Sequence, residues 1–163
     1  MIREARKEDA PALAEIYNYY VENTVITFEE EPVLPEEMER RIRTVSSTHL
    51  WLVFQEGERI LGYAYAGKWR ERASYRHSAE ATVYLRQGQG GRGLGTALYR
   101  ELIRRLPEKG VHTLIGGITL PNEASCRLHE KLGFVKTAHF REVGKKQQRW
   151  LDVGYWQLIL PEG

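Results

Sequence analysis

The chain has 163 residues, 28% of them charged, and its formal net charge is +2 at pH 7. The length suits one domain over residues 1–163 whose core needs no metal, and the balanced charge argues against a nucleic-acid partner. No segment is long and apolar enough to span a membrane, and Cys126, the only cysteine, fits a reducing compartment, so we expect a cytoplasmic protein with a small partner.

The first third of the chain predicts a strand, a helix, a loop and a second helix. Residues 2–6 have the pattern of a short edge strand, and apolar residues recur with a 3.6-residue period over residues 10–21, which indicates an amphipathic helix. Residues 22–35 lack a helical period and contain prolines, so we expect a long ordered loop that lines a site. Residues 35–44 predict a polar helix.

The middle of the chain predicts a hairpin and then a strand, a glycine cluster and a helix. WLVFQ and ILGYAYAG, joined by EGER, have the pattern of two antiparallel strands. The charged residues 69–77 indicate a loop. A strand at residues 81–85 then enters the glycine cluster, and the following helix ends near Leu106 with leucines stacked along one side.

The last third predicts a strand, a helix and two further strands. HTLIGGITL has the pattern of a buried strand, and PNEASCRLHEKLGF that of a helix with Asn122 as N-cap and Gly133 as its stop. Residues 134–160 indicate two strands joined by a polar turn. The sum is a mixed α/β or α+β fold, with an antiparallel half followed by a strand, helix, strand, helix unit.

The glycine cluster predicts a site for a phosphate or diphosphate, because a strand that enters glycines and then a helix exposes backbone N–H groups at a positive helix end. A nucleotide-triphosphate loop needs Lys and then Ser or Thr after the last glycine, but Gly95 is followed by Thr-Ala. Gly88, Gly90 and Gly93 fit the dinucleotide pattern, yet the next strand ends without the acidic residue that this fold expects. A purely structural role in tight packing stays open.

The third candidate ligand is acyl-coenzyme A. GRGLGTA, residues 91–97, resembles the pyrophosphate loop of the GNAT superfamily of N-acetyltransferases, except that Gly90 stands where Gln or Arg is usual. LPNEASCRLHEKLGF resembles the segment after the fifth strand of that fold, and two motifs in the right order are harder to obtain by chance than one. The resemblance implies an α+β fold with a central, mostly antiparallel sheet, a splayed parallel strand pair and flanking helices.

Further segments narrow the resemblance. ITFEEEP, GYAYAGKWRERASYRHSAEATVY, TLPNEASCRLHE and RWLDVGYWQL look like the phosphinothricin and methionine sulfoximine N-acetyltransferases, over nearly the whole chain. The resemblance implies transfer of an acetyl group from acetyl-CoA to the α-amino group of a small, glutamate-like amino acid, without a metal, in a homodimer. Trp150, Tyr155 and Trp156 would support the dimer contact or pack in the core.

The matching positions imply where acetyl-CoA binds. Pantetheine pairs with strand backbone in the family, and the positions that match this strand are Val83, Tyr84 and Leu85. The diphosphate loop corresponds to Gly91, Arg92, Gly93, Leu94, Gly95, Thr96 and Ala97. Asn122 and Ser125 are expected to hold the pantetheine arm or a carbonyl, although Asn122 also suits a simple helix cap.

Catalysis needs a base, because the ammonium group of the acceptor must lose a proton before it attacks the thioester. Glu80 matches the family's base and lies just upstream of the cofactor strand, where alternation puts it on one face with Thr82. The alternative is a structural glutamate that an arginine satisfies. His129 stands where the superfamily often has a tyrosine that protonates the thiolate. With an ordinary pKa of about 6.5, it suits an acid, a relay or a second base, or merely a helix histidine bonded to Ser125.

The acceptor's acidic groups call for hydrogen-bond donors, and a guanidinium suits them. Arg72 and Tyr75 lie in the matching segment of the family, and Phe28 in the early loop and Thr82 are expected to wall the pocket. Two other functions stay open: acetylation of another amine or a peptide, and a non-catalytic acyl-CoA-binding domain. Glu80, Thr82 and His129 argue against the second, because binding alone does not need them.

Overall fold

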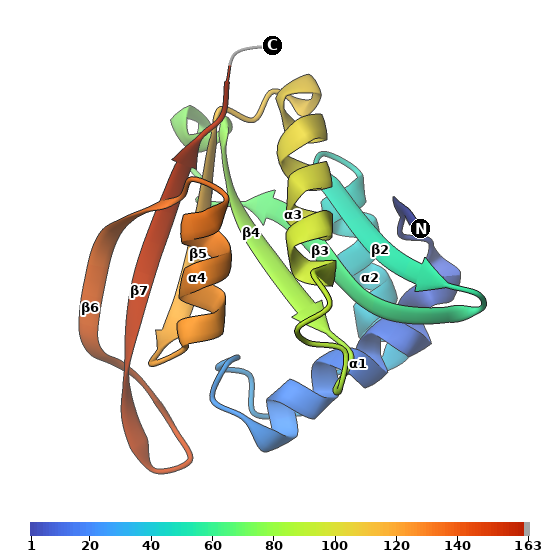
Figure 1. The fold of residues 1–163 in the computed structure, drawn as a ribbon, viewed down its shortest axis with the longest axis horizontal. Helices are drawn as coiled ribbons and strands as arrows, with labels where there is room; N and C mark the ends of the chain where they lie inside the picture. Colours follow the sequence, from blue (N-terminus) through green and yellow to red (C-terminus); the bar gives the residue numbers. More distant parts are fainter. Residues whose placement is uncertain (162–163) are drawn as a thin grey trace.

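The computed structural model describes residues 1–161, and its strands form one sheet that helices cover on both faces (Figure 1). The strand order is β1-β2-β3-β4-β5-β7-β6, and only β4 and β5 pair in parallel. The strands are β1 Ile2–Glu4, β2 Leu50–Glu56, β3 Arg59–Lys68, β4 Ser78–Leu85, β5 Thr113–Leu120, β6 Val135–Lys146 and β7 Arg149–Ile159. The helices are α1 Ala10–Asn23, α2 Pro35–Ser46, α3 Leu94–Arg105 and α4 Glu123–Lys131.

Two hydrophobic clusters hold the helices on opposite faces of the sheet. Leu102 of α3 is fully buried in the first cluster, together with Ala79 and Ala81 of β4. Leu13 of α1 and Met38 of α2 belong to the second cluster, on the other face. Burying a side chain of this size contributes roughly 1.5–3 kcal/mol, so the apolar periods of the helices decide which face each one covers. No helix within residues 1–161 is long and apolar enough to cross a membrane.

The parallel strands β4 and β5 separate soon after they meet. Residues 78–80 of β4 pair with residues 113–115 of β5, and the pairing stops there although β4 continues to Leu85 and β5 to Leu120. Beyond this point, the backbone groups on that edge of β4 have no partner in β5. Backbone N–H and C=O groups need partners, so the splayed edge is suited to pair with a ligand.

The predicted fold class and the predicted order of elements are confirmed. Several boundaries differ by about two residues, and the edge strand predicted at residues 2–6 ends at Glu4. One difference affects the site: the strand predicted at residues 81–85 begins at Ser78, so Glu80 lies within β4 rather than upstream of it. The physical reason is pairing with β3, which continues from Gly62↔Leu85 back to Lys68↔Ala79. The helix cap at Asn122 is confirmed, since its side chain accepts the Ser125 N–H at 3.2 Å.

Candidate active site

A groove of about 600 Å³ lies between the end of β4, the N-terminus of α3 and α4. The glycine cluster forms one end of it: Gly91 and Gly93 have φ angles of +78° and +79°, and Gly93 is the N-cap of α3. A Cβ on Gly90, Gly91 or Gly93 would meet nothing within 4 Å, so the loop presents its backbone to open space. The first N–H groups of a helix have no partner within the helix, so this end of the groove suits a diphosphate.

Most of the cofactor residues predicted from the sequence line this groove. They are Val83, Tyr84, Leu85, Gly91, Gly93, Leu94, Gly95, Thr96, Asn122 and Ser125. Arg92 and Ala97 do not line it. The Arg92 guanidinium instead pairs with Glu56 at 3.0 Å and with Gln89 Oε1 at 2.6 Å, on the outer surface of the loop.

Sequence reasoning missed other residues that line the groove, among them Tyr20, Arg127 and Lys131. The Tyr20 hydroxyl donates to the Leu85 carbonyl at 2.5 Å, a contact between residues 65 positions apart that no local pattern indicates. Arg127 and Lys131 stand one turn apart on α4, on the same side as Ala124 and Leu128, which also line the groove, so the i, i+3, i+4, i+7 spacing was a signal that points to them. They place positive charge beside the groove.

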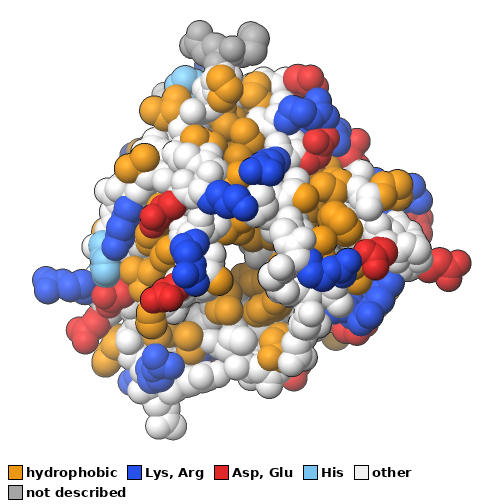
Figure 2. Space-filling view, viewed as in Figure 1, with side chains coloured by type: hydrophobic (Ala, Val, Ile, Leu, Met, Phe, Trp, Pro, Cys, Tyr) orange, Lys and Arg blue, Asp and Glu red, His pale blue; other side chains and the backbone are white. Residues whose placement is uncertain are grey.

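A second cavity, the gap, has a volume of about 90 Å³ and lies where β4 and β5 have separated. Its walls are residues 81–84 of β4 and residues 117–119 of β5, together with Ile26, Tyr99, Asn122, Ser125 and His129. Successive side chains of a strand point to opposite faces, so the gap meets both faces of the sheet. Figure 2 shows the face that carries α3 and α4 hollowed near its centre, with Lys and Arg side chains at the rim. Residues 1–161 contain no group of three or more His, Cys, Asp or Glu side chains placed to hold a metal ion.

Glu80 lies on the sheet face that α1 and α2 cover, because its neighbours Ala79 and Ala81 pack against α3. Its Oε2 atom lies 3.6 Å from the point where a Cβ on Gly117 would stand, so the missing side chain lets the carboxylate reach the edge of the gap. Burial raises the pKa of the Glu80 carboxyl, and the positive charge of Arg70 opposes part of this shift. None of the ion pairs within residues 1–161 includes Glu80, so the structure does not show an arginine that satisfies it.

His129 is buried on the other face, with 3% of its surface exposed. Its Nδ1 atom lies 2.7 Å from the Ser125 carbonyl oxygen, which only accepts, so Nδ1 carries a proton and Nε2 of the neutral ring carries a lone pair. Nε2 is buried without a hydrogen-bond partner in the described part of the chain and faces Gly116, where a Cβ would stand 2.5 Å away. Burial lowers the pKa of His129, and the bond to Ser125 opposes this shift. The structure therefore favours a neutral imidazole that accepts at Nε2.

His129 lines the gap from one face of the sheet, whereas Glu80 is not among the lining residues and lies beside Gly117, at the edge of the gap on the other face. Gly116 and Gly117 are consecutive in β5, so side chains at these positions would point to opposite faces, one toward His129 and the other toward Glu80. Two ligands that enter from the two faces would therefore meet at the gap, one beside a carboxylate and the other beside an imidazole.

The residues predicted for the acceptor pocket are not all brought together. Thr82 lines the gap, whereas Phe28, Arg72 and Tyr75 line neither cavity. The Arg72 guanidinium carbon stands 5.6 Å from the centre of the Tyr75 ring, and both side chains are exposed. Ile26, in the same early loop as Phe28, lines both cavities and was missed, because the sequence pattern did not separate it from its neighbours.

Comparison with known proteins agrees with this geometry. Residues 2–154 match the family model of the acetyltransferase (GNAT) domain. A phosphinothricin N-acetyltransferase of Streptomyces coelicolor is 38% identical over 167 residues, which cover 96% of this chain and 94% of that protein. An L-methionine sulfoximine/L-methionine sulfone acetyltransferase of Salmonella typhimurium is 37% identical over 165 residues, covering 99% of this chain and 95% of that protein. The structure of a putative acetyltransferase from Salmonella typhimurium with its cofactor acetyl-CoA matches with a TM-score of 0.96 at 36% identity, covering 100% of this chain and 95% of that one.

Proposed function

Because this chain belongs to the acetyltransferase (GNAT) family, we propose that it transfers the acetyl group of acetyl-CoA to the α-amino group of a small, glutamate-like amino acid. The names of the relatives support acceptors of the phosphinothricin, methionine sulfoximine or methionine sulfone type. The observation that carries the proposal is the gap between β4 and β5, which Glu80 approaches from one face of the sheet and the groove adjoins on the other. The single cysteine supports a cytoplasmic location.

The residues of the groove fit acetyl-CoA. The glycine loop and the N-terminus of α3 suit the diphosphate, and Arg127 and Lys131 add positive charge for phosphate groups. The backbone of residues 83–85 is not paired with β5, and apart from the Leu85 carbonyl, which accepts the Tyr20 hydroxyl, it is suited to pair with the amides of an extended pantetheine arm. When bound, acetyl-CoA supplies an acyl carbon with a thiolate as leaving group.

In the proposed reaction, Glu80 accepts the proton that the acceptor's ammonium group loses, directly or through one water. Its raised pKa makes the carboxylate a better base than an ordinary glutamate. The freed nitrogen bonds to the acyl carbon and the carbon–sulfur bond breaks. The second proton of the nitrogen passes to the departing sulfur, so an amide and the coenzyme A thiol result. Backbone N–H groups of residues 83–85 are suited to stabilise the oxyanion that forms on the way. His129, neutral with its lone pair at Nε2, suits a relay or second base rather than the acid that protonates the thiolate.

Acetyl-CoA turnover with a panel of acceptors tests the proposal. Release of the coenzyme A thiol is measured with phosphinothricin, methionine sulfoximine, methionine sulfone, the common amino acids, simple amines and short peptides. We expect acetylation of at least one of the first three. If none of them is acetylated, the acceptor assignment fails; if acetyl-CoA binds and no amine of the panel is acetylated, the non-catalytic alternative replaces the enzyme.

Arg72→Ala is expected to raise the KM for the amino acid at least about tenfold and to leave the KM for acetyl-CoA within about twofold. The reason is that Arg72 is proposed to pair with an acidic group of the acceptor, while it lies outside the groove. Steady-state kinetics with each substrate varied in turn measure both constants, and Arg76→Ala, an exposed neighbour, is the control. Equal effects on the two KM values would remove Arg72 from the acceptor site.

We further propose a homodimer that forms through β6 and β7. β6 is an edge strand of the sheet, and the exposed fractions of Phe140, Val143 and Trp150 are 52%, 58% and 61%. A group of exposed apolar side chains beside an unpaired edge is a common protein contact. Of the three tail aromatics, Trp156 is buried in the core and Tyr155 packs edge-on against Phe140, which leaves Trp150 for the contact.

Trp150→Glu is expected to convert the dimer to a monomer, because the contact would lose the indole ring and would have to remove a carboxylate from water. Sedimentation velocity of the wild type and the variant at equal concentration measures the change. Leu34→Glu is the control, since Leu34 is 67% exposed at the start of α2 and lies in another part of the chain. A monomeric wild type would contradict the dimer and leave the acetyltransferase proposal intact.

A further inference from the structure

The loop between α1 and α2, residues 24–34, contains no helix or strand and still forms a wall of the active site. Its Ile26 lines both the groove and the gap, although this side chain is 41% exposed. Segments without a backbone hydrogen-bond ladder open more easily than helices or strands, unless side chains hold them. The groups that hold this loop therefore decide whether the wall is in place before a ligand arrives.

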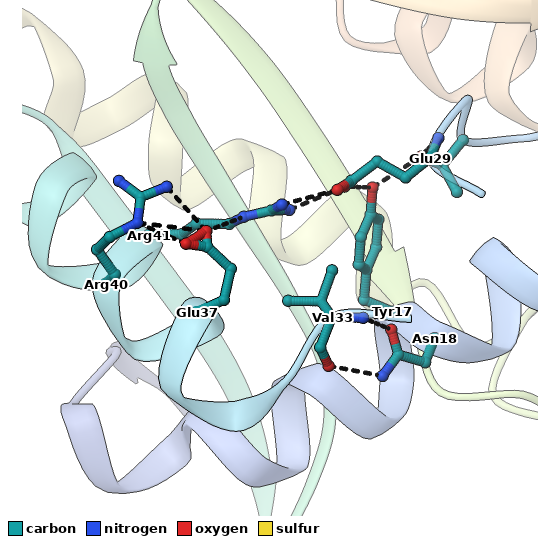
Figure 3. Close-up of polar contacts among 8 residues, drawn as sticks. Tyr17, Asn18, Glu29, Val33, Glu37, Arg40 and Arg41 are labelled. Carbon is teal, nitrogen blue, oxygen red and sulfur yellow. Dashed lines mark hydrogen bonds and ion pairs between the residues drawn. The ribbon is translucent and has the colours of Figure 1, made fainter. Parts of the chain in front are cut away.

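Polar side chains of α1 and α2 hold the second half of the loop (Figure 3). Asn18 Nδ2 donates to the Val33 carbonyl at 2.9 Å, and the Val33 N–H donates to Asn18 Oδ1 at 2.7 Å. The Arg41 guanidinium donates to both oxygens of Glu29, at 2.8 and 2.7 Å, and the Tyr17 hydroxyl donates to the same carboxylate. These contacts lie beyond Ile26, so other groups must hold the first half.

Lys146, at the end of β6, holds the first half of the loop from a distant part of the chain. It is only 5% exposed, and its Nζ donates to the Val21 carbonyl at 2.9 Å and to the Thr27 carbonyl at 2.8 Å. Val21 lies in the last turn of α1, where carbonyls lack helical partners and a positive charge is favourable. One ammonium group thus joins the end of α1 to the residue that follows Ile26.

The same strand also receives the side chain of Phe28. The Phe28 ring occupies the position where a Cβ on Gly144 would stand, so only glycine leaves room for it there. Gly144 and Lys146 are two residues apart in β6 and therefore point to the same side of the strand. β6 thus holds the loop twice, once at a backbone carbonyl and once at an aromatic ring.

Hydrogen bonds to Ile26 and to the next residue, Thr27, hold Ile26 in place. Its carbonyl accepts the Thr119 hydroxyl of β5 at 3.4 Å, and the next residue, Thr27, is bonded to Lys146 through its carbonyl. The buried Thr27 hydroxyl also lies 2.7 Å from the Tyr17 hydroxyl of α1. Of these three hydrogen bonds, only the one from Lys146 comes from β6. Its removal would therefore detach Thr27, and with it Ile26, from the ammonium group on that strand.

A buried ammonium group needs partners, because its transfer from water is unfavourable. Burial lowers the pKa of Lys146, and the charges of Glu30 and Glu29 oppose this shift. An apolar side chain would fill the same space without that penalty. What the lysine adds, compared with an apolar side chain, is therefore its two hydrogen bonds to the Val21 and Thr27 carbonyls.

We propose that Lys146 is a positioning residue for the acceptor side of the active site, which holds Ile26 at the gap through the Thr27 carbonyl. The loop is fastened to Tyr17 and Arg41 on the α1 and α2 face, where Glu80 lies at the edge of the gap. A displaced loop therefore alters the acceptor's side most. Ile26 also lines the groove, but it is the only residue of the loop that does so, and the glycine loop, α3 and α4 still form the rest of the groove. The inference rests on the proposed function for the nature of the acceptor.

Lys146→Met tests this role, because methionine has a similar length and no donor. We expect the KM for the amino acid to rise at least about tenfold, the KM for acetyl-CoA to stay within about twofold, and amide hydrogen exchange to become faster across residues 24–30. Lys136→Met, an exposed lysine of the same strand, is the control and is expected to change none of the three. An unchanged acceptor KM, or an equal rise in both KM values, would overturn the proposal.

Gly144→Ala is a second variant that keeps the ammonium group and displaces Phe28. It is expected to raise the acceptor KM, as Lys146→Met does. If Lys146→Met does not fold, Gly144→Ala tests whether displacement of the loop alters the acceptor's side. An unchanged acceptor KM in Gly144→Ala would then overturn the proposal. The wild-type assay separates the two hypotheses. If the wild type acetylates no amino acid, the proposed function fails by itself, and the exchange rates of residues 24–30 in the Lys146 and Lys136 variants still show whether Lys146 fastens the loop.

Discussion

Replacing Glu80 with glutamine is expected to lower kcat by a factor of about 10² to 10⁴, the usual contribution of a positioned base. Glutamine keeps the size of the side chain but cannot accept the ammonium proton. Glu80 forms no part of the groove, so acetyl-CoA should bind with unchanged affinity. Stopped-time assays with saturating acetyl-CoA and acceptor measure kcat, and calorimetric titration with coenzyme A measures binding.

The pH profile adds an independent check on the same residue. Burial raises the pKa of Glu80, and the base works only when ionised, so the wild-type rate should increase as the pH rises through this pKa. The rate of the glutamine variant should lack this increase. It should retain only the pH dependence that comes from deprotonation of the acceptor's own ammonium group. Glu71→Gln is the control, because the Glu71 side chain is 87% exposed and pairs with Lys68 on the surface. A glutamine variant with the wild-type rate and profile would exclude Glu80 as the base.

Thr96→Asp is expected to abolish most of the affinity for acetyl-CoA without unfolding the protein. Thr96 lies in the first turn of α3 and lines the groove, where the diphosphate is proposed to bind. At an effective dielectric constant near 20, a carboxylate about 5 Å from a phosphate charge costs about 3 kcal/mol, which is about a hundredfold in dissociation constant. The same carboxylate is favourable for the helix, by about 0.3–1 kcal/mol, because it stands near the positive end of the dipole.

Thr96→Asp is thus expected to weaken acetyl-CoA binding and to stabilise the helix, and these opposite effects separate a loss of binding from a loss of folding. Thermal unfolding without ligand should show an unchanged or slightly raised Tm, while titration with acetyl-CoA shows the loss of affinity. Arg100→Asp is the matched control, since it places a carboxylate on the exposed side of the same helix, outside the groove. Unchanged acetyl-CoA affinity in Thr96→Asp would show that the diphosphate does not bind at this end of α3.

The residues that line the groove proposed for acetyl-CoA were largely predictable from the sequence because the parts of this groove are local. The glycines, the first turn of α3 and the Asn122 cap each depend on a few consecutive residues, and their spacing fixes the positive φ angles and the exposed helix end. Arg92 was assigned to this groove by the same local pattern. Its side chain turns outward instead, because Glu56 from the β2–β3 hairpin is a nearby partner that the local pattern does not include.

The acceptor side was not predictable to the same degree. Alternation along β4 put Glu80 and Thr82 on one face, but nothing in the sequence showed that His129 approaches from the other face. That arrangement depends on the separation of β4 from β5 and on the two adjacent glycines of β5. Likewise, the pattern indicated that the loop at residues 22–35 lines a site, without showing that Ile26 rather than Phe28 reaches the gap.

The sequence by itself determined the elements, the fold class, the family and the glycine loop at one end of the groove, because periodicity, caps and glycine conformations act over a few residues. Only the tertiary structure decided which faces Glu80 and His129 occupy and what holds the loop at residues 24–34. Lys146 bonds to carbonyls 119 and 125 positions earlier in the chain. Backbone carbonyls are the same at every position, so such a contact leaves no mark in the amino-acid pattern and exists only once the strands and helices have packed.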